Sequence, residues 1–289
     1  MDYSTNLPED YRGNSEMYFR GLIDEWCDIP FMNFLTILGV SLILIMVQGV
    51  SFAQEGKWLS LGEQKVYKVV KAHERISIDG MMNEQVWQQA ESRKFEDFYR
   101  IERPSDRQST TFRMAWDEDF LYLFYSMQDK YLTAREKRRD GEPYNDDCAE
   151  IFIIPAPDSL VAHIGFELNL YKACNDFVYF NKYFNNKDYV FKAFDPEYQA
   201  ETSFVGTIND NSDEDESWNL ELAIPLSSFR NLPSENNPKS GNRWAFQAVR
   251  QDRNDPKGDR RSTSTLFPIY EASKGVHQAN RFGLMEFID

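Results

Sequence analysis

The stretch that decides the fold is FRMAWDEDFLYLFYSMQD, residues 112–129. On both sides of an acidic turn at residues 117–119, large apolar side chains recur at every second position. Successive side chains of a β-strand point to opposite faces, so a period of two is typical of strands that bury one face. The stretch therefore predicts a β-hairpin with one face in a hydrophobic core.

The same alternation recurs in the part of the chain that follows this hairpin. It is found in residues 166–170, 177–180, 218–224 and 244–250. The helical patterns are short: residues 83–90 start at Asn83 as a candidate N-cap, and residues 226–229 follow Pro225. Short strands with aromatic inward faces and turn-rich gaps predict an all-β fold, an antiparallel β-sandwich that is jelly-roll-like and has one or two short helices. The acidic run at residues 209–216 is expected to be a solvated loop.

The composition permits a sizeable core and restricts the class of ligand. The chain has 289 residues, of which 42% are hydrophobic and 15% aromatic, enough for one sandwich-sized domain or two small ones. Trp87, Trp116 and Trp244 are expected to fill the core. The formal net charge of −15 would repel the phosphates of nucleic acids and of anionic lipids. We therefore expect neutral or cationic ligands and no nucleic-acid partner.

The N-terminal region has the pattern of an export signal. Fourteen uncharged residues, 34–47, precede the small-x-small sequence at residues 51–53 that is typical of a cleavage site. Residues 1–53 are thus expected to be a signal peptide with an atypical, acidic N-terminal extension. Residues 54–289 are expected to be a single monomeric domain that is exported, whether periplasmic, cell-surface or secreted. Alternatively, the uncharged segment 29–54 stays uncleaved and anchors the protein in a membrane.

Two cysteines, Cys148 and Cys174, would remain after cleavage. An oxidising compartment would allow them to pair. If residues 148–154 and 164–174 form a hairpin, counting by twos places Cys148 on the face of Glu150 and Cys174 on the opposite face. Two free thiols are therefore expected.

An acidic residue interrupts one of the most apolar predicted strands. In YNDDCAEIFIIP, residues 144–155, Glu150 stands inside the apolar run. The hairpin proposed above would bring Glu167 beside it. Two explanations are open, and both can hold together: Glu150 faces a ligand cleft, or it is buried and pairs with an arginine such as Arg113 or Arg250.

Six blocks of this sequence occur in an order that a known family shares. The first, ISIDGMMNEQVWQQA (76–90), is read as a strand, an Ile-Asp-Gly turn and a Glu-x-x-Trp on a short helix. The second is the hairpin at 112–129, and the others are NDDCAEIFI (145–153), FELNL (166–170), LELAIPLSSF (220–229) and RFGLMEF (281–287). Together they resemble family 9 carbohydrate-binding modules over about residues 76–287. The resemblance implies a β-sandwich that binds poly- or oligosaccharide without catalysis and supports carbohydrate breakdown.

The resemblance also implies which residues contact the sugar. The acid at Glu150 would bond sugar hydroxyls, and the aromatic six residues earlier, Tyr144, would stack on the ring. Glu167 stands where the family often has a polar or basic side chain, and it makes the cleft more acidic. A second aromatic of the family is replaced by Val276-His277, so only an imidazole can stack there and altered specificity is expected. The expected carbohydrate-binding residues are Tyr144, Glu150, Glu167, Asn169, Arg250, Asp252 and His277, with Gln247 on the same late strand as Arg250.

Relatives in this family bind structural calcium, so a calcium ion is considered as a cofactor. Oxygen ligands are plentiful, but the loop at residues 129–140 also contains Arg135, Lys137, Arg138 and Arg139, and no EF-hand spacing occurs. No metal ligands are assigned from the sequence. The histidines and cysteines show no zinc-ligand spacing.

Two other functions stay open at this point. Some sandwiches related to this family hold haem for electron transfer, and their iron ligands are side chains such as Met and His. The residues with that chemistry here are Met114, Met127, His163 and His277.

The second alternative is a glycoside hydrolase, which needs two carboxylates flanking the scissile bond. Glu150 with Glu167 or Asp252 is available for that role. In the family, catalysis belongs to separate enzyme domains. The resemblance therefore implies that this chain is not an enzyme.

Overall fold

The hairpin predicted at residues 112–129 is present. In the computed structural model, β4 (Thr110–Trp116) and β5 (Phe120–Gln128) pair antiparallel. Asp117 Oδ1 closes the turn by accepting hydrogen bonds from the backbone N–H groups of Asp119 and Phe120, at 2.8 and 2.7 Å. The period-two pattern is therefore confirmed as a pair of strands.

The structure describes residues 66–155, 162–184, 187–229, 238–269 and 275–289. The predicted signal segment at residues 34–47 and its cleavage site lie outside these residues, so export and the domain boundary stay predictions. In the described part of the chain, no helix combines the length and the apolar character that a membrane crossing requires.

The described residues form 14 strands and few helical turns. Besides β4 and β5, the strands are β1 (Tyr67–Lys71), β2 (Arg93–Lys94), β3 (Asp97–Arg100), β6 (Cys148–Ile154), β7 (Ala162–Asn169), β8 (Cys174–Phe184), β9 (Lys187–Phe191), β10 (Gln199–Val205), β11 (Ser217–Pro225), β12 (Arg243–Arg253), β13 (Arg261–Thr265) and β14 (Gly283–Ile288). The helical elements are α3 (Gln85–Gln89) and the 3₁₀ turns η2 (Pro104–Asp106), η3 (Pro143–Asn145), η4 (Leu226–Phe229) and η6 (Ala279–Arg281).

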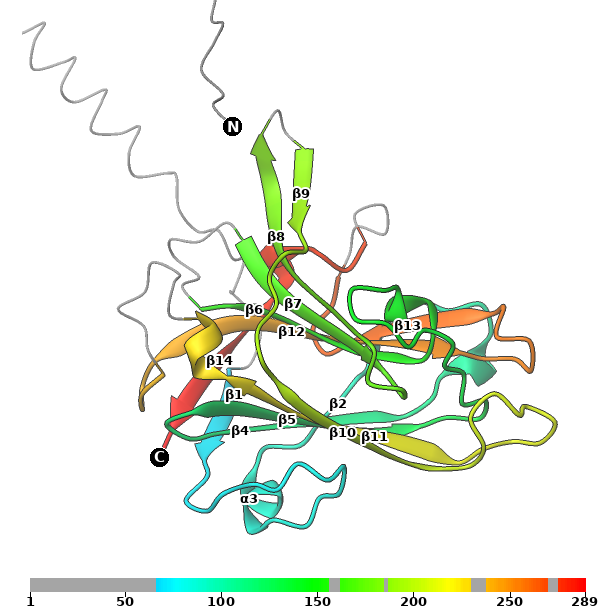
Figure 1. Cartoon of the computed structure of the whole chain (residues 1–289), viewed down its shortest axis with the longest axis horizontal. Helices are drawn as coiled ribbons and strands as arrows, with labels where there is room; N and C mark the ends of the chain where they lie inside the picture. Colours follow the sequence, from blue (N-terminus) through cyan, green and yellow to red (C-terminus); the bar gives the residue numbers. More distant parts are fainter. Residues whose placement is uncertain (1–65, 156–161, 185–186, 230–237, 270–274) are drawn as a thin grey trace, which may run out of the picture. The chain divides into compact units, whose positions relative to one another are not determined.

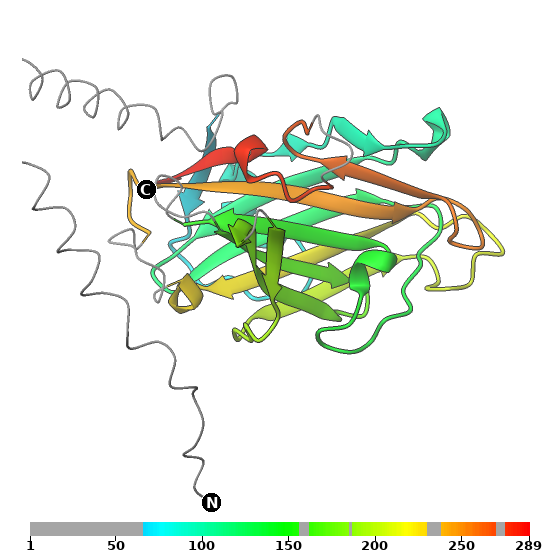
Figure 2. The same ribbon diagram turned by 90° about the horizontal axis from the view of Figure 1, so that it is seen from above.

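The strands form one continuous sheet that is folded into two layers. Its order is β10-β11-β5-β4-β1-β14-β12-β6-β7-β8-β9. Figure 1 shows β10, β11, β5 and β4 below β12, β6 and β7, and Figure 2 shows β14 (red) running beside β12 (orange). The predicted sandwich is confirmed. The strands are antiparallel to their neighbours except β1, which is parallel to both β4 and β14. In the strand order, β1 and β14 connect the strands of one layer to those of the other.

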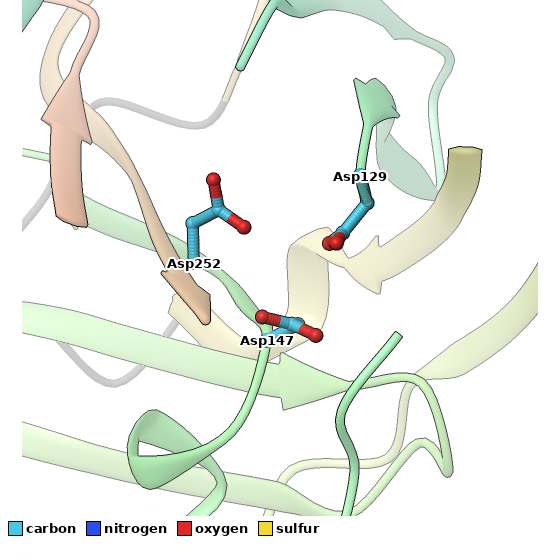
Figure 3. Close-up of side chains that lie close together, drawn as sticks. All are labelled: Asp129, Asp147 and Asp252. Atoms are coloured by element: carbon cyan, nitrogen blue, oxygen red, sulfur yellow. The ribbon is translucent and has the colours of Figure 1, made fainter. Parts of the chain in front are cut away.

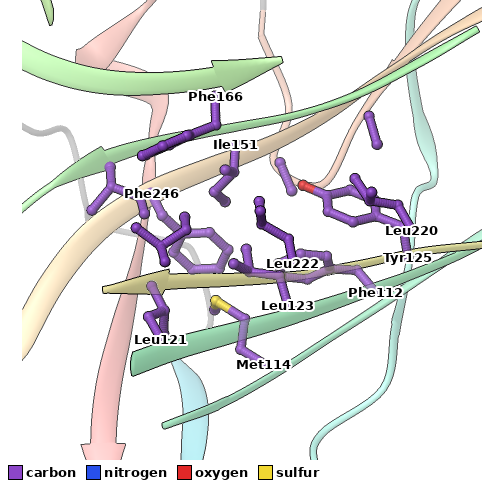
Figure 4. Packing of buried hydrophobic residues seen from close by; sticks show 14 of the residues in the cluster. Phe112, Met114, Leu121, Leu123, Tyr125, Ile151, Phe166, Leu220, Leu222 and Phe246 are labelled. Atoms are coloured by element: carbon purple, nitrogen blue, oxygen red, sulfur yellow. The ribbon is translucent and has the colours of Figure 1, made fainter. Parts of the chain in front are cut away.

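The main core lies between the two layers (Figure 4). Phe112 of β4 stacks on Phe246 of β12, with ring centroids 6.1 Å apart. Tyr125 of β5 donates a hydrogen bond through its hydroxyl to the carbonyl oxygen of Glu150 in β6, at 2.7 Å. Trp116 and Trp244 are buried in this core, as predicted. Aromatic packing and the hydrogen bond of the Tyr125 hydroxyl therefore connect the two layers.

Helix α3 covers the opposite face of the β5–β11 layer. Trp87 is buried there against Phe124, with ring centroids 5.6 Å apart, and its Nε1–H donates to Glu221 Oε1 at 3.2 Å. Glu221 Oε2 accepts the backbone N–H groups of Asp79 and Gly80, at 2.9 and 3.0 Å. Gly80 has φ +78°, and a Cβ there would lie 2.9 Å from the backbone of β10, which explains the glycine of the Ile-Asp-Gly turn.

Two smaller predictions have opposite outcomes. The residue before α3 is Glu84, and no side chain caps the helix, so the prediction of Asn83 as N-cap was wrong. Cys148 and Cys174 are both buried and free, as expected. Cys174 belongs to the main core, whereas Cys148 is on the face of Glu150.

Replacing Trp87 by alanine should destabilise the protein by about 3–5 kcal/mol, because it empties a buried site and removes a donor from Glu221. Urea unfolding monitored by circular dichroism measures this change. Met81→Ala is the matched control: Met81 precedes the same helix but is 52% exposed, so a change within about 0.5 kcal/mol is expected. Equal stability of the two variants would contradict the packing described above.

Candidate binding site

A cavity of about 370 Å³ lies on the face of the β12-β6-β7-β8 layer that points away from the core. Four buried polar side chains that line it come one from each of these strands: Glu150 (β6), Glu167 (β7), Asn175 (β8) and Gln251 (β12). Small-molecule sites typically have volumes of roughly 300–1,000 Å³. The cavity is therefore large enough for a sugar unit.

The two glutamates are direct cross-strand partners, and Asn175 is in turn opposite Glu167. Gln251 Nε2 donates to Glu150 Oε1 at 2.9 Å, and Asn175 Nδ2 donates to Glu167 Oε2 at 2.7 Å. Among the described residues, neither glutamate forms an ion pair. Pairing of Glu150 with an arginine is therefore wrong, and the other explanation, a carboxyl group facing a cleft, agrees with the geometry.

Burial controls the protonation of this pair. It raises the pKa of Glu150 to about 7, against the opposing effects of the Gln251 hydrogen bond and the positive charge of Arg261. Burial, together with the negative charge of Glu150, raises the pKa of Glu167 well above its usual range. A low-dielectric environment disfavours the charged form of an acid, and a like charge opposite adds to this.

Two of the predicted residues, Arg250 and Asp252, lie outside the cavity. Val249 of β12 is the direct partner of Glu150, so Gln251 shares the face of Glu150 while Arg250 points to the other. Arg250 Nη2 donates to the carbonyl oxygen of Gln128 at 2.7 Å, at the end of β5. Because a one-residue shift changes the face of the sheet, the structure has Gln251 at the position that the sequence analysis gave to Arg250.

Asn169 also lies outside the cavity, at the end of β7. Its Nδ2 donates to the Glu136 carbonyl oxygen and to Asp146 Oδ2, at 2.8 and 2.9 Å. Its Oδ1 accepts the backbone N–H groups of Tyr171 and Ala173. These bonds hold the β7–β8 turn, and they use both ends of the amide. Gln247, on the face of Glu150, is likewise bonded to the backbone of Phe267.

His277 and Tyr144 both line the cavity. The imidazole of His277 lies parallel to the ring of Tyr179, with centroids 4.3 Å apart, and its Nδ1 is 3.1 Å from Nε2 of His163. Burial lowers the pKa of His277 to about 4, so the ring is neutral at pH 7. Tyr144 is half-buried in η3. Tyr179, which the sequence analysis placed in a strand without a role, thus completes an aromatic wall.

A second polar cluster lies apart from the cavity. The carboxylates of Asp129, Asp147 and Asp252 point toward one another in Figure 3, each offering one oxygen within 4.8 Å of the others. All three side chains are buried. Arg250 Nη2 lies 3.1 Å from oxygens of both Asp129 and Asp252. Three carboxylates around one guanidinium leave an excess of negative charge, and oxygen-only ligands are those that calcium prefers, so these residues fit a calcium ion.

The residues considered for haem do not converge on one site. Met114 and Met127 belong to the main core between the layers. His163 and His277 lie on the cavity face of the β12-β6-β7-β8 layer, away from the core. Nε2 of His163 points toward Nδ1 of His277. This arrangement does not support the haem alternative.

The pKa of Glu150 makes stability depend on pH. The folded protein keeps a proton on this group up to about pH 7, whereas an unfolded glutamate loses it near 4.5. Folded chains therefore bind more protons than unfolded ones in this window, so the free energy of unfolding should fall as pH rises from 4.5 to 7. Glu221, whose pKa burial also raises to about 7, acts in the same direction.

In Glu150→Gln, the free energy of unfolding should fall by roughly 1–3 kcal/mol less between pH 4.5 and 7 than in the parent. The variant should therefore be more stable than the parent above pH 7. Urea unfolding at several pH values between 4.5 and 8 measures the two profiles. Glu214→Gln, at an exposed loop residue, is the control and should leave the profile unchanged. Parallel profiles for the parent and Glu150→Gln would contradict the assigned pKa.

A family model described as "Carbohydrate family 9 binding domain-like" matches residues 78–289. A comparison with curated protein sequences gave no match. Among solved structures, the chain is similar to a family 9 carbohydrate-binding module from Caldicellulosiruptor kristjanssonii in complex with cellotriose, at 17% identity and a TM-score of 0.51, covering 78% of this chain and 94% of that one. The same organism's module in complex with glucose gives 16% identity and a TM-score of 0.50, with 76% and 95% coverage.

A putative carbohydrate-binding protein from Bacteroides uniformis is similar at 17% identity, with a TM-score of 0.59 and coverage of 78% of this chain and 100% of that one. At these identities the solved structures establish the fold alone. The family model spans most of the chain, including the hairpin, both glutamate strands and the C-terminal strand. The protein therefore belongs to the family of carbohydrate family 9 binding domain-like proteins.

Proposed function

We propose that this protein binds carbohydrate, without catalysis, in the cavity around Glu150. The observation that carries the proposal is that Tyr144 and Glu150, six residues apart in sequence, line one cavity together with the amides of Asn175 and Gln251. Its membership of a carbohydrate-binding family supports the same function. So do two similar solved structures, which hold cellotriose and glucose.

The cavity combines the two kinds of contact that a sugar requires. Hydroxyl groups need hydrogen-bond partners, which the carboxyl groups and amides of the buried part provide. The C–H faces of the ring need apolar surface, which Tyr144 and the Tyr179–His277 stack provide. Because the polar groups come from four neighbouring strands, their positions are set before the ligand arrives.

Glucose and cellotriose are the probes for this proposal. Tyr144→Ala should weaken binding by at least about tenfold through loss of the aromatic surface, while stability changes by about 1 kcal/mol or less. At about pH 8, above the pKa of Glu150, Glu150→Gln removes a charged acceptor and should weaken binding by about 1.5–3 kcal/mol. Isothermal titration calorimetry measures both effects.

Phe204→Ala is the control for these titrations, since Phe204 is 45% exposed and does not line the cavity. It should bind like the parent. Unchanged affinity in both Tyr144→Ala and Glu150→Gln would place the sugar elsewhere on the protein. No heat of binding for the parent with either probe would argue against these two sugars as ligands.

We also propose that Asp129, Asp147 and Asp252 hold a calcium ion with a structural role. Asp129 directly follows β5, Asp252 is near the end of β12, and Asp147 directly precedes β6, so an ion here would connect the two layers. Burial and the neighbouring aspartates raise the pKa of Asp147 well above its usual range. A divalent cation would favour the ionised form and supply the missing positive charge.

Calcium should therefore stabilise the folded protein. At a concentration about 100-fold above the dissociation constant, the expected gain is about 2.7 kcal/mol. Thermal melts in calcium and in excess chelator measure it, and Asp147→Asn should abolish the difference. Asp213→Asn, at an exposed loop residue, should keep it. Identical melts of the parent with calcium and with chelator would refute the calcium site.

A further inference from the structure

The paired glutamates of the cavity lack a cation of their own. Glu150 is 1% exposed, and its Oε2 atom accepts no hydrogen bond from the described residues, although the side chain lines an open cavity. Glu167, its cross-strand partner, is 4% exposed. Buried carboxylates in proteins are normally paired with a cation, bound to a metal or protonated. Here the missing group can be supplied by the ligand.

The charged neighbours leave room for one positive charge. Arg261 of β13 is half-buried and acts electrostatically on Glu150, but it forms no ion pair with either glutamate. Arg100 and Lys192 also line the cavity and are exposed, so solvent screens them. The imidazole of His277 is neutral. When both glutamates are ionised they carry two negative charges, which Arg261 and the exposed, solvent-screened Lys192 offset only in part. Their raised pKa values mean that the pair holds a proton until a cation takes its place.

Hydrogen-bond chemistry restricts the ligand group further. Ionised carboxylates only accept hydrogen bonds, and one oxygen of each glutamate is already used by an amide donor. A sugar hydroxyl has a single hydrogen to donate, so two hydroxyls are needed for the two glutamates, and neither supplies a positive charge. A protonated amine has three, carries the matching charge, and bonds to carboxylates more strongly than a neutral donor.

We propose that the cavity selects a sugar carrying a protonated amine, as in 2-amino-2-deoxy sugars, and that the ammonium group lies between Glu150 and Glu167. The inference rests on the proposed carbohydrate function and specifies the class of sugar. Glu167 is then the residue that determines specificity, because it adds the second carboxylate. The net negative charge of the whole chain favours the approach of such a ligand.

The test compares three trimers by isothermal titration calorimetry at pH 6.5: the glucosamine trimer, the N-acetylglucosamine trimer and cellotriose. The glucosamine trimer should bind the parent at least about tenfold more tightly than the other two. Glu167→Gln keeps the shape of the side chain but replaces one acceptor oxygen by an NH2 donor and removes the charge, so it should lose most of this preference. Glu214→Gln removes the same charge from an exposed loop and should keep the preference.

Each outcome distinguishes this inference from the proposed function. Equal binding of glucosamine trimer and cellotriose by the parent would overturn the inference and leave carbohydrate binding in place, with the pair holding a proton instead of an amine. An amine preference that survives in Glu167→Gln would also overturn it, since the cation would then be recognised elsewhere. Absence of binding for all three trimers would count against the proposed function itself.

Discussion

Strand β6 is buried on both faces, and the rest of the molecule depends on that constraint. Its side chains alternate between the core and the outer face, so Ala149, Ile151 and Ile153 pack between the layers while Glu150 and Phe152 point outward. The C-terminal segment covers the outward face near Phe152, where Phe282 stacks on it with centroids 6.3 Å apart. Near Glu150 the same face opens into the cavity. The side chains of β6 that point into the core therefore stabilise the fold, whereas Glu150, on the opposite face, is available for binding.

Buried acids in this protein have three different environments. Glu221 accepts two backbone N–H groups and the indole of Trp87, so its role is to hold the N-terminal turn and helix on the first layer. Asp129 belongs to the aspartate cluster, where Arg250 of β12 contacts the end of β5 in the other layer. Glu150, by contrast, keeps an oxygen without a partner. Because Glu150 lines an open cavity, its free oxygen can be satisfied by a ligand that enters from solvent.

The cavity is assembled from segments that are distant in sequence. Tyr144 comes from η3, Glu150 and Glu167 from the β6–β7 hairpin, Gln251 from β12 and His277 from the segment before η6. Most of these positions depend on hydrogen-bonded strand register, which is set by the core on the opposite face. Packing that preserves the sandwich therefore also preserves the geometry of the binding groups. The aromatic wall adds a contact between β8 and the C-terminal segment through Tyr179 and His277.

The sequence by itself determined the class of fold, because alternation with a period of two is a local property that survives without knowledge of partners. It also determined the facing pair Glu150 and Glu167, since a hairpin of neighbouring strands follows from local counting. It misassigned β12: Arg250 and Gln251 differ by one position, and only the pairing with β6 decides which faces the cavity. The partners of Asn169, the neutral stack of His277 and the meeting of Asp129 with Asp147 and Asp252 were equally beyond it. These features depend on contacts between segments far apart in the chain, and such contacts exist only once the two layers have packed.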